Sequence, residues 1–303
     1  MNGRMEVKMK QFSARMFHKG TWVISGEGCD CYLLEGEHEA IMIDTGESRD
    51  NIQEFAQTLT KKPLCKAVNT HSHFDHTGGN GFFDTIYATK GIAGSAKNTM
   101  GADPASYPLN YEFTFIEDGD ILNPGERPLQ VIMLGCHSPE DIVILDIRNR
   151  ILFSGDEVES GQVLLLPGYA ERPGQIHAVP AATVEAYLIA VKRLRAMESA
   201  FDSICPGHNG TPIDNSYLDW LIILCEKILN GEIVGSAECS SPSYDQRDTH
   251  FPYPNAGYRR AEYQGAALVY CGELLRNADI AEAGKLPPAT PLHLISSYYA
   301  YRK

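Results

Sequence analysis

A histidine-rich segment constrains this chain more than any other feature. Residues 69–79 read NTHSHFDHTGG and come directly after a short apolar run that is typical of a β-strand. In an extended chain alternate side chains point the same way, so His71, His73 and Asp75 share one side. His76 breaks that alternation and reaches a second point. Because imidazole and carboxylate groups are the ligands that zinc prefers in hydrolytic sites, the segment predicts a metal site at a strand end.

Three further candidate ligands follow apolar runs elsewhere in the chain. His137 comes after the run 130–134, Asp156 after Ile151-Leu152-Phe153-Ser154-Gly155, and His208 after the run 203–205. Loops at strand ends are where rigid elements present functional groups. Each of these residues alone is an ordinary polar side chain, but together with the first segment they predict a shared metal site.

The order of apolar patterns indicates the fold class. Helical spacing is found at 50–59, with Asp50 as the expected N-cap, at 181–199 and at 215–230. Short strands are expected at 21–24, 31–34, 40–43, 64–68, 86–88, 114–116, 130–134, 142–146, 151–154 and 203–205. Strands followed by a helix, twice over, predict an α/β protein with two sheets face to face and helices outside, which is a four-layered αββα sandwich.

The C-terminal part has a different composition. We expect a hydrolase domain over residues 1–235 and a C-terminal extension over residues 236–303, packed on the same domain as a lid or a dimer element. Ser, Pro, Tyr and Arg dominate residues 240–260, which predicts a loop, and residues 261–278 are expected to form a helix.

The charge and the hydropathy of the chain limit the classes of partner that we expect it to bind. The 303 residues carry a formal net charge of -13, which disfavours nucleic acid and anionic membranes as partners. No run of 18 apolar residues and no apolar signal-peptide core is present. We therefore expect a cytoplasmic protein with reduced cysteines that acts on a small molecule, and we leave a homodimer open.

The candidate ligands resemble, in order, the ligand motifs of the metallo-β-lactamase superfamily. The resemblance covers roughly residues 20–235 and implies the αββα fold. Asp44, in Ile43-Asp44-Thr45-Gly46, resembles the structural aspartate of the family's first motif. By position, the resemblance implies that the first metal binds His71, His73 and His137. The second would bind Asp75, His76 and His208, and Asp156 would bridge the two.

The full ligand set resembles glyoxalase II and the bacterial lactonases within that superfamily. It implies a di-zinc hydrolase in which a hydroxide that bridges the metals attacks an ester, a thioester or a lactone, with Asp75 orienting it as the catalytic residue. Iron and manganese are alternative metals. Alternative activities at the same site are hydrolysis of a phosphodiester, a sulfate ester or a β-lactam, or an iron-dependent oxidoreductase reaction.

Overall fold

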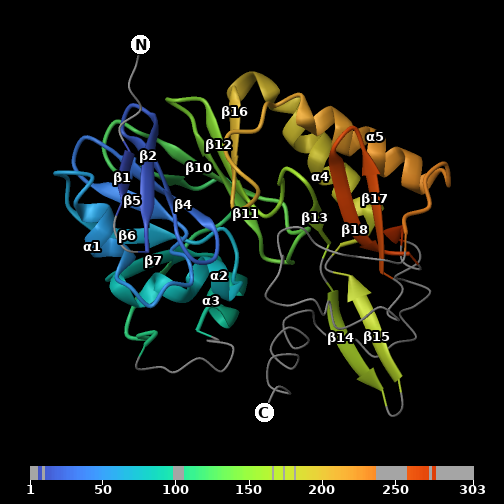
Figure 1. The fold of residues 1–303 in the computed structure, drawn as a ribbon, viewed down its shortest axis with the longest axis horizontal. Coiled ribbons are helices and arrows are strands. Elements are labelled where there is room, and N and C mark those ends of the chain that lie inside the picture. Colours follow the sequence, from blue (N-terminus) through green and yellow to red (C-terminus); the bar gives the residue numbers. More distant parts are fainter. Residues whose placement is uncertain are drawn as a thin grey trace. The chain divides into compact units, whose positions relative to one another are not determined.

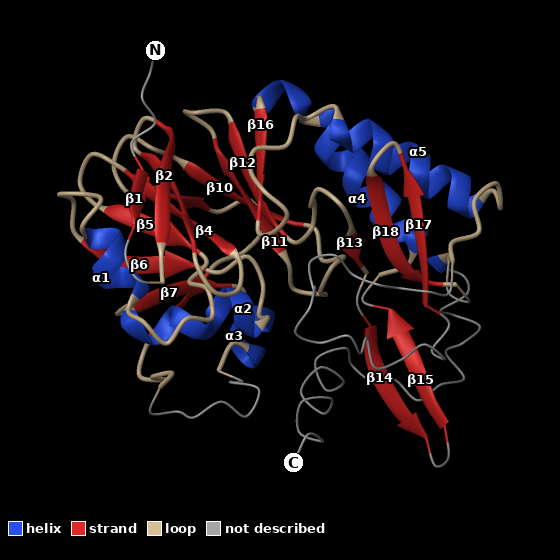
Figure 2. Ribbon diagram, in the orientation of Figure 1, coloured by secondary structure: helices blue, strands red, loops and turns tan. Residues whose placement is uncertain are grey.

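The computed structural model describes residues 6–8, 11–97, 106–165, 167–172, 175–180, 182–236, 258–272 and 275–277. The chain divides into two compact units (Figure 1). Unit 1 comprises Met1–Met133 and Ile142–Gly155, and unit 2 comprises Leu134–Asp141 and Asp156–Lys303. Both units contain strands and helices, which confirms the predicted α/β class (Figure 2).

The first sheet of unit 1 is mixed. Strands β1 to β5 pair antiparallel with their neighbours, and β5 to β8 pair in parallel. The strands, which follow one another in chain order across the sheet, are β1 (Glu6–Lys8), β2 (Ser13–His18), β3 (Thr21–Ser25), β4 (Asp30–Glu35), β5 (Ala40–Ile43), β6 (Leu64–Val68), β7 (Thr85–Ala88) and β8 (Glu112–Phe115). The parallel part brings the carboxyl ends of β5 and β6 to the same edge, and these ends carry Asp44 and the histidine-rich segment.

The second sheet of unit 1 contains four antiparallel strands in the order β12, β11, β10, β9. These are β9 (Ile121–Leu122), β10 (Leu129–Met133), β11 (Ile142–Asp146) and β12 (Ile151–Gly155). Every residue of β11 and β12 is buried, as expected for strands covered on both faces. The ring centroids of Tyr32 on β4 and Phe153 on β12 lie 4.9 Å apart, so aromatic packing joins the two sheets.

Short helices connect the parallel strands of unit 1. They are α1 (Ile52–Gln57), α2 (Phe74–Thr77), the 3-10 turn η1 (Gly78–Phe82) and α3 (Lys90–Ser95), and Figure 1 shows them next to β6 and β7. The N-cap of α1 is Asn51, whose side chain accepts from the Glu54 N–H, rather than the expected Asp50. The cap falls one residue later because the oxygen must lie within reach of the third helical N–H group.

Unit 2 is built around two helices and a hairpin. Its elements are β13 (Val163–Leu164), β14 (Pro167–Arg172), β15 (Gln175–Pro180), α4 (Val184–Ala196), the 3-10 turn η2 (Glu198–Ala200), β16 (Ser203–Pro206), α5 (Tyr217–Leu229), β17 (Tyr258–Tyr263) and β18 (Ala266–Cys271). Helices α4 and α5 pack together, and α5 contacts β17 and β18. Strand β13 pairs in parallel with β18, whose six residues are all buried.

The helix expected over residues 261–278 is wrong. Residues 261–271 form part of a β-hairpin in which β17 and β18 pair from Tyr258↔Cys271 to Tyr263↔Ala266. Gln264 and Gly265, which join the strands, both have positive φ angles, 54° and 88°. That geometry favours a tight hairpin turn and ends any helix. Because β18 is buried on both faces, its unbroken apolar run cannot be told from a buried helix by periodicity.

The loop expected over residues 240–260 lies almost wholly outside the described residues. The boundary expected between the domain (residues 1–235) and the C-terminal extension (residues 236–303) stays a prediction. Within the part of the chain that the structure describes, no helix is long and apolar enough to cross a membrane.

Candidate metal centre

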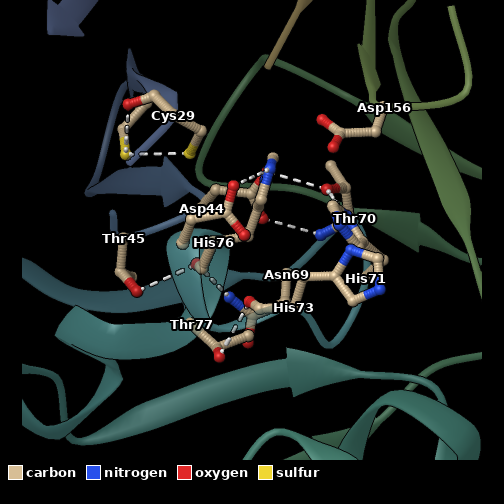
Figure 3. Close-up of polar contacts among 12 residues, drawn as sticks. Cys29, Asp44, Thr45, Asn69, Thr70, His71, His73, His76, Thr77 and Asp156 are labelled. Carbon is tan, nitrogen blue, oxygen red and sulfur yellow. Dashed lines mark hydrogen bonds and ion pairs between the residues drawn. The ribbon is translucent and has the colours of Figure 1, made fainter. Parts of the chain in front are cut away.

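Unit 1 gathers the histidine-rich segment at the end of β6. The chain leaves β6 after Val68 and enters α2 at Phe74, with His73 as the N-cap residue. The ring centroids of His71 and His73 lie 4.5 Å apart, and those of His71 and His76 lie 4.1 Å apart (Figure 3). His71 and His76 are fully buried, whereas Asp75 keeps 23% of its side chain exposed. The unit 1 half-site, which we define as His71, His73, Asp75 and His76, is therefore compact and open on one side.

A single buried carboxylate supports this half-site. Asp44 Oδ1 accepts from the Thr70 N–H at 2.8 Å, and Asp44 Oδ2 accepts from the Thr70 hydroxyl at 2.7 Å. The same Oδ2 lies 2.8 Å from His76 Nδ1 (Figure 3). Asp44 has a φ angle of 55°, a left-handed conformation that aspartate tolerates better than most residues. Its placement at the end of β5 agrees with the structural role that the sequence resemblance implies.

These contacts fix the tautomers of two imidazoles. Since the Asp44 carboxylate can only accept, Nδ1 of His76 carries the proton. The Thr70 hydroxyl donates its one proton to Asp44, so at 3.1 Å it accepts from Nδ1 of His71. In the neutral form both rings therefore present the lone pair of Nε2, which is the form that binds a metal. Thr70 thus plays the supporting role expected for a residue next to a ligand.

A layer of polar residues beneath the half-site was missed by the sequence reasoning. The Asn69 amide donates to the carbonyl of His76 and to the side-chain oxygen of Asn80, and the single proton of the Thr45 hydroxyl lies within reach of the same two oxygens, at 3.1 and 2.9 Å. Cys29 offers a sulfur that lies, with atoms of Asp44 and His76, in a group whose ligand atoms are all within 4.8 Å. Burial raises the pKa of the Cys29 thiol well above its ordinary value, so it is a protonated, apolar neighbour of His76. No local motif marks these residues, because the contacts join separate segments.

The two glycines after the segment are needed for close packing. A Cβ on Gly79 would lie 2.4 Å from the Thr45 carbonyl oxygen, and one on Gly78 would lie 2.9 Å from the Gly46 oxygen. Gly78 itself has ordinary helical angles, φ -57° and ψ -36°. The need for glycine at both positions is therefore explained by contact with the loop after β5 rather than by an unusual turn.

Unit 2 brings together the three other predicted ligands. His137 lies in the loop 134–141, Asp156 follows β12, and His208 follows β16. Asp156 Oδ2 lies 3.5 Å from His137 Nε2 and also 3.5 Å from His208 Nε2. We call His137, Asp156 and His208 the unit 2 half-site. His137 and Asp156 are buried, and 20% of the His208 side chain is exposed.

A second buried acid supports the unit 2 half-site. Glu157 Oε1 accepts from the backbone N–H groups of Cys136 and His137 at 2.6 and 3.2 Å. Burial is the main cause that raises the pKa of Glu157 to about 7. Burial also raises the pKa of Asp141 well above its usual range, and the charge of Glu157 adds to this. Ser138, which follows His137, donates through its N–H and its hydroxyl to Asp141.

The donor chemistry of both half-sites fits divalent metal ions. His137 Nδ1 lies 2.7 Å from the Leu164 carbonyl oxygen, which can only accept, so the Nε2 lone pair faces the Asp156 carboxylate. A lone pair and a carboxylate oxygen repel each other at 3.5 Å unless a cation lies beside them. Two ligand atoms on one tetrahedral zinc, each roughly 2.1 Å from it, are separated by about 3.4 Å. The observed separation therefore suits two ligands of a shared ion.

Comparison with known proteins identifies the superfamily of this chain. The model of the metallo-β-lactamase superfamily matches residues 24–219. This chain belongs to that superfamily.

Characterised relatives are distant. The chain is 24% identical over 222 residues to the human protein named acyl-coenzyme A thioesterase MBLAC2, covering 62% of this chain and 75% of the relative. It is 29% identical over 143 residues to the hydroxyacylglutathione hydrolase of Hydrogenovibrio crunogenus, covering 46% of each chain. A metallo-β-lactamase structure from Erythrobacter litoralis superposes with a TM-score of 0.55 at 18% identity, covering 74% of this chain and all of that one, 100%. At that identity the structural likeness confirms the fold.

Proposed function

We propose that this protein is a thioester hydrolase that depends on two zinc ions. The first ion would bind His71, His73 and His137. The second would bind Asp75, His76 and His208, and Asp156 would be shared by both. This assignment follows the family's ligand order, position by position, and uses every ligand candidate of both half-sites.

One observation carries the proposal. His71, His76 and His137 each have Nδ1 engaged by a polar partner, and in each case the partner leaves the Nε2 lone pair for a metal. Such orientation of a ligand by a hydrogen bond to its other ring nitrogen is typical of working metal sites. A histidine cluster without that role has no need of three rings held in the same tautomer.

The residues of the half-sites have separable tasks in the reaction. Bound zinc ions supply Lewis-acid activation of water and of the thioester carbonyl. Asp75 orients the attacking water and accepts its proton, because its carboxylate is the most exposed acid of the unit 1 half-site. Asp44 and Thr70 hold the imidazoles in place and take no part in proton transfer.

The choice of thioester rests on the relatives. Two distant relatives, an acyl-coenzyme A thioesterase and a hydroxyacylglutathione hydrolase, carry names that refer to thioesters. The two thioesters differ in the thiol part, so the thiol part is the first variable to test. The substrate preference would be set by the side chains around the metal ions rather than by the ions themselves.

The test is thiol release from full-length protein purified without chelators. Acyl-coenzyme A and hydroxyacylglutathione thioesters are supplied in parallel, and the released thiol is measured with a chromogenic disulfide. A background without substrate is essential, because Cys65 is exposed and reacts with the same reagent. We expect turnover by the wild type, loss after chelation, recovery with zinc, and a fall of at least about 100-fold in Asp75→Asn. Asp50→Asn, at an exposed acid, is the matched control.

Several outcomes would contradict the proposal. A zinc-loaded protein that cleaves neither thioester but cleaves a lactone, a phosphodiester, a sulfate ester or a β-lactam would keep the metal site and replace the substrate. Iron in place of zinc, with a redox-active absorption spectrum, would move the protein to oxidoreductase chemistry.

A further inference from the structure

The three ligands of the unit 2 half-site come from three separate segments. His137 belongs to the loop 134–141, Asp156 begins the segment after β12, and His208 follows β16. Nothing in the local sequence fixes the distances among these segments. Their spacing must therefore be set by contacts between them, and the described side chains show which contacts these are.

The segment 156–160 binds the loop that carries His137. Glu157 accepts from the N–H groups of Cys136 and His137 itself, through one oxygen. The backbone of Glu157 is anchored in turn, because the Tyr187 hydroxyl of α4 donates to its carbonyl at 2.8 Å. Glu157 keeps only 1% of its surface exposed, and no Lys or Arg among the described residues forms an ion pair with it. Burying such an acid is costly, and the two N–H groups, together with a side-chain hydrogen bond to Asp141, offset the cost.

The same segment also binds the loop that carries His208. Glu159 Oε2 accepts from the Asn209 side chain at 3.1 Å, and the Ser160 hydroxyl donates to the Asn209 carbonyl at 2.7 Å. Asn209 directly follows His208 and has a φ angle of 63°, a left-handed conformation that asparagine tolerates. Glu159 is 2% exposed. These contacts hold the turn in which His208 sits.

We propose that Glu157 and Glu159 are positioning residues that set the geometry of the unit 2 half-site. The segment that supplies Asp156 acts as a template: Glu157 fixes the backbone of His137 on one side, and Glu159 fixes the turn of His208 on the other. Neither carboxylate binds the metal itself. The inference rests on the proposed function only in requiring that the half-site binds a metal.

The test is cobalt binding by metal-free, full-length protein carrying Glu157→Gln or Glu159→Gln. Cobalt(II) reports geometry through its visible absorption bands, independently of catalysis. We expect cobalt affinity to fall about 10- to 100-fold in each variant and the visible bands to change in position or intensity. Glu232→Gln, at an exposed acid of unit 2 that pairs with Lys227, is the matched control and should leave both unchanged.

A purely structural role would lower thermal stability without changing the spectrum of the folded, loaded protein. If Glu157→Gln does not fold, Tyr187→Phe gives the same readout, because it removes the hydroxyl that anchors the Glu157 backbone. If Glu159→Gln does not fold, Asn209→Gly replaces it, because it removes the contact to Glu159 and tolerates the positive φ. Unchanged cobalt affinity and bands in the folded variants would overturn the inference, and so would a wild type that binds no cobalt. A wild type that binds cobalt but cleaves no thioester would contradict the proposed function and leave the inference standing.

Discussion

The two half-sites reach the same chemistry by different construction. In unit 1 all four candidate ligands lie within six residues, and one carboxylate, Asp44, supports them. In unit 2 the candidate ligands are His137, Asp156 and His208, and two carboxylates, Glu157 and Glu159, connect their segments. A contiguous ligand segment needs support from only one point, whereas dispersed ligands need contacts that fix their spacing. Loss of Asp44 should therefore abolish metal binding by the unit 1 half-site. Loss of Glu157 or Glu159 alone should only weaken metal binding by the unit 2 half-site.

The largest expected effect comes from Asp44→Asn. The amide keeps the shape and tolerates the positive φ, but it cannot accept on both oxygens from Thr70 and His76. We expect the free energy of unfolding to fall by roughly 3 kcal/mol and both zinc ions to be lost, because each is assigned ligands in the unit 1 half-site. Urea unfolding and elemental analysis measure the two effects. A variant with the stability and zinc content of Asp50→Asn would show that the half-site does not depend on one carboxylate.

Gly155→Ala tests how closely β12 approaches the unit 1 half-site. Its Cβ would lie 2.5 Å from Thr70 Oγ1, at a φ angle of 50°. We expect a loss of about 1–3 kcal/mol beyond that of Gly231→Ala, which has a φ angle of 73° and open space around it. Thermal unfolding of both variants measures the difference. Equal losses would mean that Thr70 moves aside without cost.

Substitutions at two threonines test the support of the metal site separately from the support of the fold. Thr70→Val removes the hydroxyl that orients His71, so we expect zinc affinity to fall by about 10-fold. Thr183→Val removes the N-cap of α4 and should cost about 1 kcal/mol of stability with zinc affinity unchanged. Zinc titration measures the zinc affinity of both variants, and urea unfolding measures their stability. If Thr70→Val kept full affinity, the tautomer of His71 would have another determinant.

Alkaline unfolding gives the smallest effect and compares the two units directly. Burial raises the pKa of Tyr111 in unit 1 and of Tyr217 in unit 2 to about 12. Between pH 10 and 12 the unfolded chain loses these protons before the folded one does, so stability falls as the pH rises. At pH 11 each tyrosine contributes about 1 kcal/mol of this loss, which Tyr111→Phe or Tyr217→Phe should remove. Equal slopes for the variants and the wild type in unfolding curves from pH 9 to 11.5 would contradict the burial of these hydroxyls.

Much of the fold was predictable because its signals are local. Buried strands such as β11 and β12 are continuous apolar runs, and α4 and α5 have clear helical spacing. The hairpin of β17 and β18 was mistaken for a helix because burial on both faces hides the strand period. The β14–β15 hairpin was not among the strands expected from the sequence.

The candidate site likewise contains residues that the sequence predicts and residues that it does not. The histidine-rich segment is visible in the sequence because its ligands are neighbours. Asp44, His137, Asp156 and His208 were assigned to roles only through the family resemblance. Glu157, Glu159 and Cys29 could not be found at all, since what matters about them is which distant backbone or side chain they contact.

The most direct test of the central claim is metal content per chain, measured by elemental analysis on wild type, His71→Ala and Asp156→Ala purified without chelators. The account predicts about two zinc ions per wild-type chain, loss of one in His71→Ala, and loss of both in Asp156→Ala, because Asp156 is the ligand assigned to both ions. A wild type that binds no metal after reconstitution with zinc, or two variants that keep the full wild-type content, would contradict it.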